Sequence, residues 1–207
     1  MTRLYVDKRE VAAIPPDLTS LDQVIKLVET NHLSPRSVIR QVNIDGLPLT
    51  ADGPAACLPA RLVDSEMIEV FTGTLSEVAV DSIREAIVYL ARIEEAIPSL
   101  ASSFRNAMGP EAFDNLKQFY EGFYWLNLLL DRLAQSFAIS LDSIQIGDMS
   151  GSEHHQNLIA TLKAVIEAHE KSDFGLVADL LAYEMLPLVP VCRLVFGAIR
   201  ERIVSEP

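Results

Sequence analysis

The sequence is poor in positive charge and in cysteine, and each shortage excludes classes of protein. Its 207 residues hold 17 Lys and Arg against 29 Asp and Glu, for a formal net charge of −12. A nucleic-acid-binding protein needs a basic surface, so this composition excludes that class. The two cysteines, Cys57 and Cys192, are too few for a disulfide framework or a four-cysteine zinc site. The N-terminal segment has no apolar signal-peptide core, and we therefore expect a cytoplasmic protein.

The sequence also lacks the short motifs that accompany common catalytic chemistries. It contains no glycine-rich phosphate-binding loop and no G-x-S-x-G nucleophile motif. Cys57 has no neighbouring histidine and Cys192 falls in an apolar segment, so both thiols are expected to be packed or incidental. We therefore expect neither catalytic residues nor a cofactor.

Metal-binding patterns are scarce in the helical part of the chain. Helical bundles that hold paired iron use Glu-x-x-His motifs on two helices. No glutamate stands three residues before any of the histidines there, which are His154, His155 and His169. The neighbours His154 and His155 diverge by about 100° on a helix, and with Glu153 they are typical of an exposed first helical turn. We expect no metal site.

Apolar residues are plentiful, at 49% of the sequence, which excludes a disordered chain. The most apolar stretch, residues 176–199, nevertheless contains Asp179, Glu184 and Arg193. A charge at the centre of a membrane-spanning helix is unfavourable by about 2.5–3.5 kcal/mol. The stretch therefore favours a buried helix, and we expect no membrane span.

The first third of the chain begins with the pattern of a hairpin and a helix. Leu4 and Val6 alternate with polar neighbours, and a polar run over residues 7–10 leads to a second apolar segment. Ser20 and Gln23 then form a capping box. The apolar residues that follow have helical spacing, so one amphipathic helix is predicted here.

Two more strands are predicted before residue 74. Val38, Val42 and Ile44 share one face of the first strand, which ends at the turn dipeptide Asp45-Gly46. Residues 67–71 alternate in the same way and form the second strand.

This order of two strands, a helix and two strands resembles the β-grasp, the ubiquitin-like fold. The resemblance covers residues 1–73 and rests on element order. Ubiquitin-like modifiers and sulfur carriers of this fold end in a free Gly-Gly, whereas here Gly73 stands alone and the chain continues to residue 207. The resemblance therefore implies a docking surface or scaffold, and not covalent tagging or sulfur delivery.

Residues 74–207 have the three-and-four spacing of apolar residues that is typical of helices. Thr74 and Glu77 form a capping box, and the apolar face behind them reaches Pro98, which ends or kinks the helix. Gly109-Pro110 begins a second helix, apolar on nearly every side, that we expect at the centre of the fold.

Two more helices follow a predicted loop at residues 147–152. Asp173 caps the last of them, with a kink at Pro187 or Pro190. The predicted fold class is α+β, with a β-grasp domain at 1–73 and an antiparallel bundle of about four helices at 74–207. The join between them is short, so we expect the two domains to dock.

Several polar residues interrupt the apolar helix faces; they are Asn127, Asp131, Asp179, Tyr183 and Glu184. Buried carboxylates must be paired or protonated. The bundle either places them at its edge or pairs them with arginines, for which the candidates are Arg84, Arg92, Arg132 and Arg193. A cleft with perturbed carboxylates is the functional alternative. Residues 176–187 also look like a segment of uncharacterised bacterial proteins that couple a small front domain to a helical region.

These features favour a non-enzymatic bacterial interaction module, such as an adaptor or a secretion-type chaperone. The helical part carries most of the negative charge, which indicates either simple solubility or a basic protein partner. An exposed sheet edge and an apolar groove are the expected partner surfaces. The alternative is a ligand-binding or catalytic bundle with a polar cleft among Tyr120, Tyr124, Asp131 and Glu184.

The aromatic helix also bears on self-association. In a four-helix arrangement each helix keeps an outer face, so some of its aromatic residues should reach a surface; the candidates are Tyr120, Phe123, Tyr124 and Trp125. Contiguous exposed apolar patches generally mark an interface. Either the front domain or a second copy covers this face, and we favour a homodimer.

Overall fold

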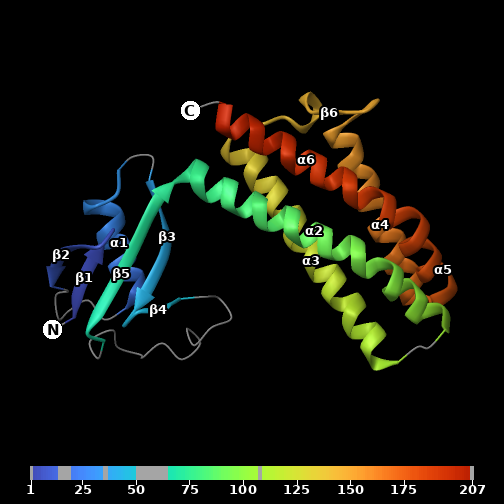
Figure 1. Ribbon diagram of the computed structural model, residues 1–207, viewed down its shortest axis with the longest axis horizontal. Helices are drawn as coiled ribbons and strands as arrows, with labels where there is room; N and C mark the ends of the chain where they lie inside the picture. The colour runs from blue at the N-terminus through green and yellow to red at the C-terminus, as the bar shows by residue number, and fades with distance from the viewer. Residues whose placement is uncertain (1, 14–19, 35–36, 50–64, 107–108, 206–207) are drawn as a thin grey trace. The chain divides into compact units, whose positions relative to one another are not determined.

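The computed structural model describes residues 2–13, 20–34, 37–49, 65–106 and 109–205. Cys57 lies outside the described residues. The fold class is α+β, as predicted, with a mixed sheet followed by long helices (Figure 1). The chain divides into two compact units, residues 1–78 and 79–207. The division lies in the first helical turn after the sheet, a few residues beyond the boundary predicted at residue 73.

The N-terminal unit is a five-stranded sheet with one helix. The strands are β1 (Arg3–Val6), β2 (Arg9–Ala13), β3 (Ser37–Ile44), β4 (Leu47–Pro48) and β5 (Met67–Thr74), and the helix is α1 (Leu21–Asn31). Their order is β2-β1-β5-β3-β4, and β1 pairs parallel with β5 while its other neighbour, β2, is antiparallel. The Ser20–Gln23 capping box is confirmed at the start of α1. Val24 and Val28 of α1 pack with Leu4, Ile68 and Val70 in one core.

Strand β5 is held at both ends by aspartates from tight turns. Asp7 accepts hydrogen bonds from the backbone N–H of Thr72, at 2.8 Å, and from its hydroxyl, at 2.6 Å. Asp45 accepts from the backbone N–H groups of Glu66 and Met67 at 2.9 and 2.8 Å. Both aspartates have positive φ, 48° and 50°, as the first residue of a type I′ turn requires. The two hairpin turns therefore also fix the register of β5.

Strand β3 contains a bulge, which changes which of its side chains face the core. The pairing of β3 with β5 shifts register between Ile39 and Gln41. An extra residue at a bulge reverses the alternation of side chains between the two faces. As a result Ile39 joins Val42 and Ile44 in the core, and the prediction that Val38 shares their face is wrong.

We predict that Asp45→Ala loosens the start of β5. The substitution removes two hydrogen bonds to backbone N–H groups and places alanine at positive φ, which together destabilise this end of the sheet by about 2 kcal/mol. Amide hydrogen exchange should then become roughly tenfold to thirtyfold faster at Glu66 and Met67. Glu29→Ala, at an exposed position of α1, is the control; equal exchange in the two variants would contradict the role given to Asp45.

The second unit is built from long helices around one apolar cluster. The elements are α2 (Leu75–Asn106), α3 (Pro110–Ser136), η3 (Leu141–Ser143), β6 (Gln145–Ile146), β7 (Met149–Ser150), α4 (Gly151–Glu170), α5 (Phe174–Asp179), η4 (Leu180–Met185) and α6 (Leu186–Ser205). Helices α4 and α6 lie side by side (Figure 1). Buried side chains from α2, α3, α4, α5 and α6 share the cluster, which gives this unit its own core.

Helix α2 passes through Pro98 without ending. The predicted capping box is present, because Thr74 and Glu77 each accept a hydrogen bond from the other's backbone N–H, at 3.1 and 2.8 Å. Pro98 is exposed, while Ile97, Leu100 and Phe104 are buried. The ring therefore lies on the solvent side of the helix, and the apolar face continues into the core beyond it. The sequence predicts that Pro98 either ends or kinks this helix, and the prediction that the helix ends there is wrong.

The predicted loop at residues 147–152 is a small hairpin joined directly to a helix cap. Gly147, with φ of 63°, lies in the turn between β6 and β7. Ser150 and Glu153 then form a capping box for α4. Arg202 of α6 donates to the hydroxyl and the backbone carbonyl of Ser143, which ties the end of the last helix to this segment.

The last helix is continuous but contains a π-helical turn. Asp173 caps it as predicted, by accepting from the backbone N–H of Leu176 at 3.1 Å. The irregular turn is η4, where the N–H of Leu186 bonds to the carbonyl of Leu181. It ends at Met185, two residues before Pro187, whose ring would meet the carbonyl of residue 183 in a regular helix; the wider turn relieves that clash.

Among the described residues, the helix Phe174–Ser205 alone is long and apolar enough to cross a membrane. This is weak support for a span, since a core helix of a soluble protein has the same length and composition. In its most apolar window 28% of the residues are buried inside the structure.

Helix α3 does not lie at the centre, contrary to prediction. Phe123 is buried, yet Tyr124 is 66% exposed and Trp125 and Leu128 are 38% and 37% exposed. The side of α3 that faces α2 is held by a close contact. A Cβ atom on Gly122 would lie 1.6 Å from the Tyr89 hydroxyl, so only glycine leaves room for this ring. The Tyr89 ring in turn meets Trp125 edge to face, with centroids 5.8 Å apart.

We predict that Gly122→Ala destabilises the helical unit by about 1–3 kcal/mol, although alanine favours helix. The new methyl group displaces the Tyr89 ring, and Trp125 loses its edge contact. Because Trp125 is the single tryptophan, its fluorescence emission should shift to longer wavelength. The matched control is Gly197→Ala in α6, where a Cβ meets nothing within 4 Å. Equal Tm values and unchanged emission in the two variants would contradict this packing.

Candidate functional site

An open cleft lies between α2 and α3, with a volume of about 290 Å³. Four large apolar side chains of the helical core, each at most 7% exposed, lie beneath it: Ile93, Ile97, Leu100 and Phe119. Its polar lining comes from five further residues: Tyr89, Arg92, Ser99, Asn115 and Gln118. A mainly apolar hollow with a few polar groups is the usual form of a small-molecule site.

The charged and amide side chains of the cleft, from Arg92, Asn115 and Gln118, are exposed at its rim. Arg92 is the one charged residue in the lining, and it makes no ion pair with any described residue. The side chains of Asn115 and Gln118 likewise bond to no residue that the structure describes. Tyr89 differs, because its ring packs on Gly122; burial and the nearby Glu121 raise the pKa of its hydroxyl. The cleft therefore keeps one guanidinium and two amides for solvent or a ligand.

A smaller cavity lies beside the two neighbouring histidines. His155 Nε2 is 2.6 Å from the amide oxygen of Asn127, whose nitrogen donates to Asp131 at 3.5 Å. With the amide in this orientation, His155 carries its proton on Nε2 and donates it. His154 Nε2 lies 3.0 Å from the carbonyl oxygen of Ile146. Both rings are half-buried, so the expectation of an exposed first turn is wrong for the histidines.

The histidine cavity has a volume of about 30 Å³ and is lined mainly by apolar side chains. That volume admits about one or two water molecules. Cys192 also lines it, and burial raises the pKa of this thiol to about 12. The thiol is therefore protonated at neutral pH, and Cys192 packs against the helical core as predicted.

The residues expected to form an interface or cleft lie in several places. Phe123 is buried, whereas Tyr124 and Trp125 are exposed on the outer side of α3. Tyr120 is half-buried, and its enclosed hydroxyl has no partner among the described atoms. Burial and then the nearby Glu170 raise the pKa of this hydroxyl to about 12. Neither cavity described above is lined by any residue of the expected polar cleft, namely Tyr120, Tyr124, Asp131 and Glu184.

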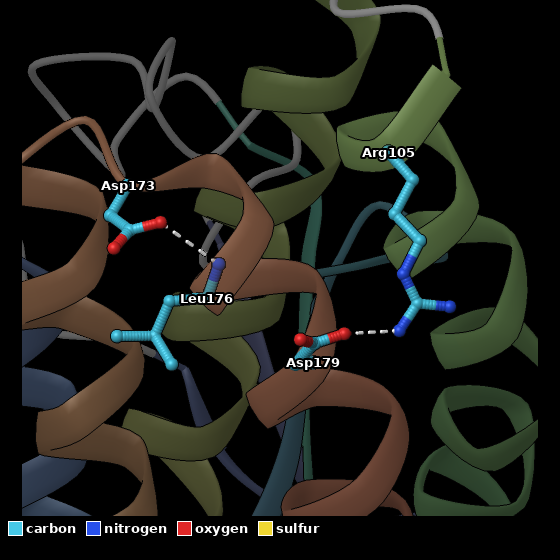
Figure 2. Close-up of polar contacts among 4 residues, drawn as sticks. All are labelled: Arg105, Asp173, Leu176 and Asp179. Carbon is cyan, nitrogen blue, oxygen red and sulfur yellow. Dashed lines mark hydrogen bonds and ion pairs between the residues drawn. The ribbon is translucent and has the colours of Figure 1, made fainter.

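The acidic residues of the last helix are exposed, and the predicted arginines do not pair with them. Asp179 accepts a hydrogen bond from Arg105 at the end of α2, as Figure 2 shows. The Arg105 guanidinium also lies 5.4 Å from the centre of the Tyr183 ring. Bonding to Asp179 and Tyr183 raises the pKa of Arg105. Glu184 is exposed, so these residues lie at the edge of the fold.

Two of the arginines proposed as partners bind other acids. Arg84 pairs with Asp81 at 2.8 Å, and Arg193 pairs with Glu94 at 2.5 Å. The expectation that arginines pair with buried carboxylates fails because the carboxylates concerned are not buried.

One end of the helical unit holds a cluster of aromatic rings from four helices. Phe104, Phe113 and Phe174 contact one another with centroids 5.7–5.9 Å apart. His169 of α4 lies against Phe113 and Phe174, and its ring is 6.2 Å from that of Tyr120. His169 thus packs as an aromatic ring.

Within the described ranges, no group of three or more His, Cys, Asp or Glu side chains could hold a metal ion. Glu29 and His32 do have Glu-x-x-His spacing, but they are exposed at the end of α1, in the other unit. Sequence reasoning missed both cavities. The position of Arg92 among apolar helix residues could have indicated the cleft, but the sequence analysis considers this arginine only as a partner for a buried carboxylate.

The chain belongs to the family described as Domain of unknown function (DUF8042), which matches residues 81–191, more than half of its length. No curated protein and no solved structure matches the chain. The residues that line the α2–α3 cleft all lie in the matched region, whereas the histidine cavity is also lined by Cys192, Val195 and Phe196, which follow it.

We predict that Cys192 is unreactive in the folded protein. With a pKa of about 12, only about one thiol in ten thousand is ionised at pH 8, against about a quarter of free cysteine. In a Cys57→Ser variant, Ellman's reagent at pH 8 should react at least a thousandfold more slowly before unfolding in urea than after it. Reaction of the folded variant at the rate of the unfolded one would contradict the burial of this thiol.

Proposed function

We propose that the protein is a non-enzymatic interaction module, of the adaptor or secretion-chaperone kind, that binds a protein partner through one face of α3. This face, the α3 strip, consists of Tyr124, Trp125 and Leu128. They are the exposed large apolar residues of the middle of the helix. Residues three and four apart are neighbours on a helix, so the three side chains form one continuous patch. Exposed aromatic side chains gathered in this way generally mark an interface.

Charged residues border the α3 strip at both ends. Lys117 and Glu121 form an ion pair one turn before it, at 3.8 Å. Asp131 and Arg132 are exposed one turn after it. An apolar centre with a polar rim is the usual composition of a protein interface, and tyrosine and tryptophan are enriched in such centres. This arrangement carries the proposal.

We further propose that the N-terminal unit is a β-grasp domain used for docking. The parallel pair β1 and β5 at the centre, the antiparallel hairpins on either side and the helix α1 packed on the sheet support this. Strands β2 and β4 are at the edges of the sheet, and an edge strand can pair with an extended partner segment.

For the helical unit we propose an antiparallel bundle. The shared apolar cluster and the short connections between its helices support that arrangement. Its sequence from residue 74 holds 10 basic and 19 acidic side chains, which supports a basic partner. We propose that the module acts in the cytoplasm. Its negative net charge disfavours binding to nucleic acid, and the charged residues of its last helix disfavour a membrane span.

The α3 strip can be tested by capture of partners from the native cell. With wild-type protein as bait, we expect specific protein partners, and Tyr124→Ser/Leu128→Ser should reduce their recovery at least tenfold. Leu194→Ser is the matched control, because Leu194 is 57% exposed on a different helix. Equal recovery with the double variant would exclude the strip. Reproducible absence of any partner of the wild type would contradict an adaptor role.

A second copy of the chain is one possible occupant of the α3 strip, and the sequence favours a homodimer. Light scattering at micromolar concentration should then give twice the monomer mass of 22.9 kDa for the wild type and the monomer mass for Tyr124→Ser/Leu128→Ser. A wild-type species of 22.9 kDa would exclude the dimer and leave the strip to a different protein.

A further inference from the structure

Exposed charged residues border the α3 strip at both ends, and their order along the helix is informative. Lys117 and Glu121 precede the strip, and Asp131 and Arg132 follow it, so each end carries one base and one acid. The side chains of Lys117 and Glu121 stay 75% and 65% exposed although they pair with each other. Arg132 makes no ion pair with any described residue. These charges are therefore available to a partner that lies on the strip.

The four charges also divide between the two sides of the strip. A helix turns by about 100° per residue, so positions can be measured around its axis from Leu128, which lies opposite the buried side of α3. Glu121 and Arg132 lie on one side of Leu128, at about 20° and 40°. Lys117 and Asp131 lie on the other side, at about 20° and 60°. Each side therefore has charges of opposite sign at its two ends, and their order is reversed between the sides.

This pattern is complementary to itself when two copies of α3 lie antiparallel. A two-fold axis perpendicular to the helix places each position before the axis against a position after it in the second copy, on the same side. With the axis beside Trp125, Glu121 lies against Arg132 of the second copy, with an offset of about 4 Å along the helix. Lys117 lies against Asp131 of the second copy with the same offset, which the long lysine and arginine side chains can cover. A parallel pair would instead place Glu121 against Glu121 and Arg132 against Arg132, so the charges favour the antiparallel arrangement.

We propose that the α3 strip binds a second copy of the chain in an antiparallel arrangement, about a two-fold axis beside Trp125. The apolar residues of the strip form the centre of this interface, and the charged pairs at its two ends fix the direction in which the helices run. Charges across an interface act mainly on orientation and specificity, so the affinity comes from the apolar centre. The proposal rests on the proposed function, because it takes the same strip as the contact surface.

The first test is reversal of one charge at a time in the full-length protein, with the dimer dissociation constant measured by sedimentation equilibrium. Glu121→Arg and Arg132→Glu each bring like charges together at two points of the symmetric dimer, and each should raise the dissociation constant by roughly tenfold or more. The matched control is Glu167→Arg in α4, since Glu167 pairs with Lys171 at 3.8 Å just as Glu121 pairs with Lys117. A wild-type dissociation constant in either Glu121→Arg or Arg132→Glu would overturn the antiparallel arrangement.

Combining the two reversals tests the pairing directly. The variant Glu121→Arg/Arg132→Glu should return to within about threefold of the wild-type dissociation constant, because opposite charges meet again at both points. An equimolar mixture of the two single variants should form a heterodimer. In that heterodimer one contact joins the two introduced charges and the other joins the two native ones, each of opposite sign. A double variant or a mixture that stays monomeric would overturn the pairing.

The outcomes also separate this proposal from the interaction role. Tyr124→Ser/Leu128→Ser should be monomeric, and a dimer of wild-type affinity in that variant would overturn the proposal by placing the contact elsewhere. A wild-type protein that is monomeric at micromolar concentration, yet captures a protein partner through the strip, would overturn the antiparallel dimer and leave the interaction role standing. A dimer that responds to the charge reversals as expected but captures no partner would support this arrangement and contradict the adaptor role.

Discussion

The Tyr89 ring packs on Gly122 where α2 and α3 meet, and this one ring borders both the α3 strip and the α2–α3 cleft. The Tyr89 ring occupies the space that a Cβ atom would need on Gly122. The same ring lines the α2–α3 cleft on one side and meets Trp125 on the other. A larger residue at position 122 would therefore change the cleft and the α3 strip together. A glycine within a helix lowers its intrinsic stability, and here that loss permits a close packing contact.

Several residues that usually interrupt regular structure are accommodated within the helices and the sheet. Pro98 lies on the exposed side of α2, so the helix continues and its buried face extends to Phe104. Pro187 follows a π-helical turn that keeps α5 and α6 in one continuous helix. In the N-terminal unit, Asp7 and Asp45 serve both as turn residues and as acceptors for the backbone of β5. In each case a residue that interrupts regular structure is placed where the surrounding residues compensate for it.

The two candidate surfaces carry different chemistry. The α3 strip is aromatic, continuous and bordered by charges of both signs, which suits the surface of another protein. The cleft is an open hollow whose exposed rim carries Arg92 and two amides, over apolar residues that are already buried in the helical core. Both lie within or beside the part of the chain that matches its family, so they are features that can be compared in other members.

The sequence by itself determined the local structure, because caps, turns and periodicity depend on residues close together in the chain. The capping boxes at Ser20 and Thr74, the Asp45-Gly46 turn and the cap at Asp173 are all present. What only the tertiary structure decided was which faces the helices bury. The many aromatic residues of α3 predict a helix at the centre of the fold. In the structure its neighbours cover only one side of it, and Tyr124 is exposed to solvent. Likewise Arg92 and Phe119 are far apart in the chain, and they line one cleft only because α2 packs beside α3.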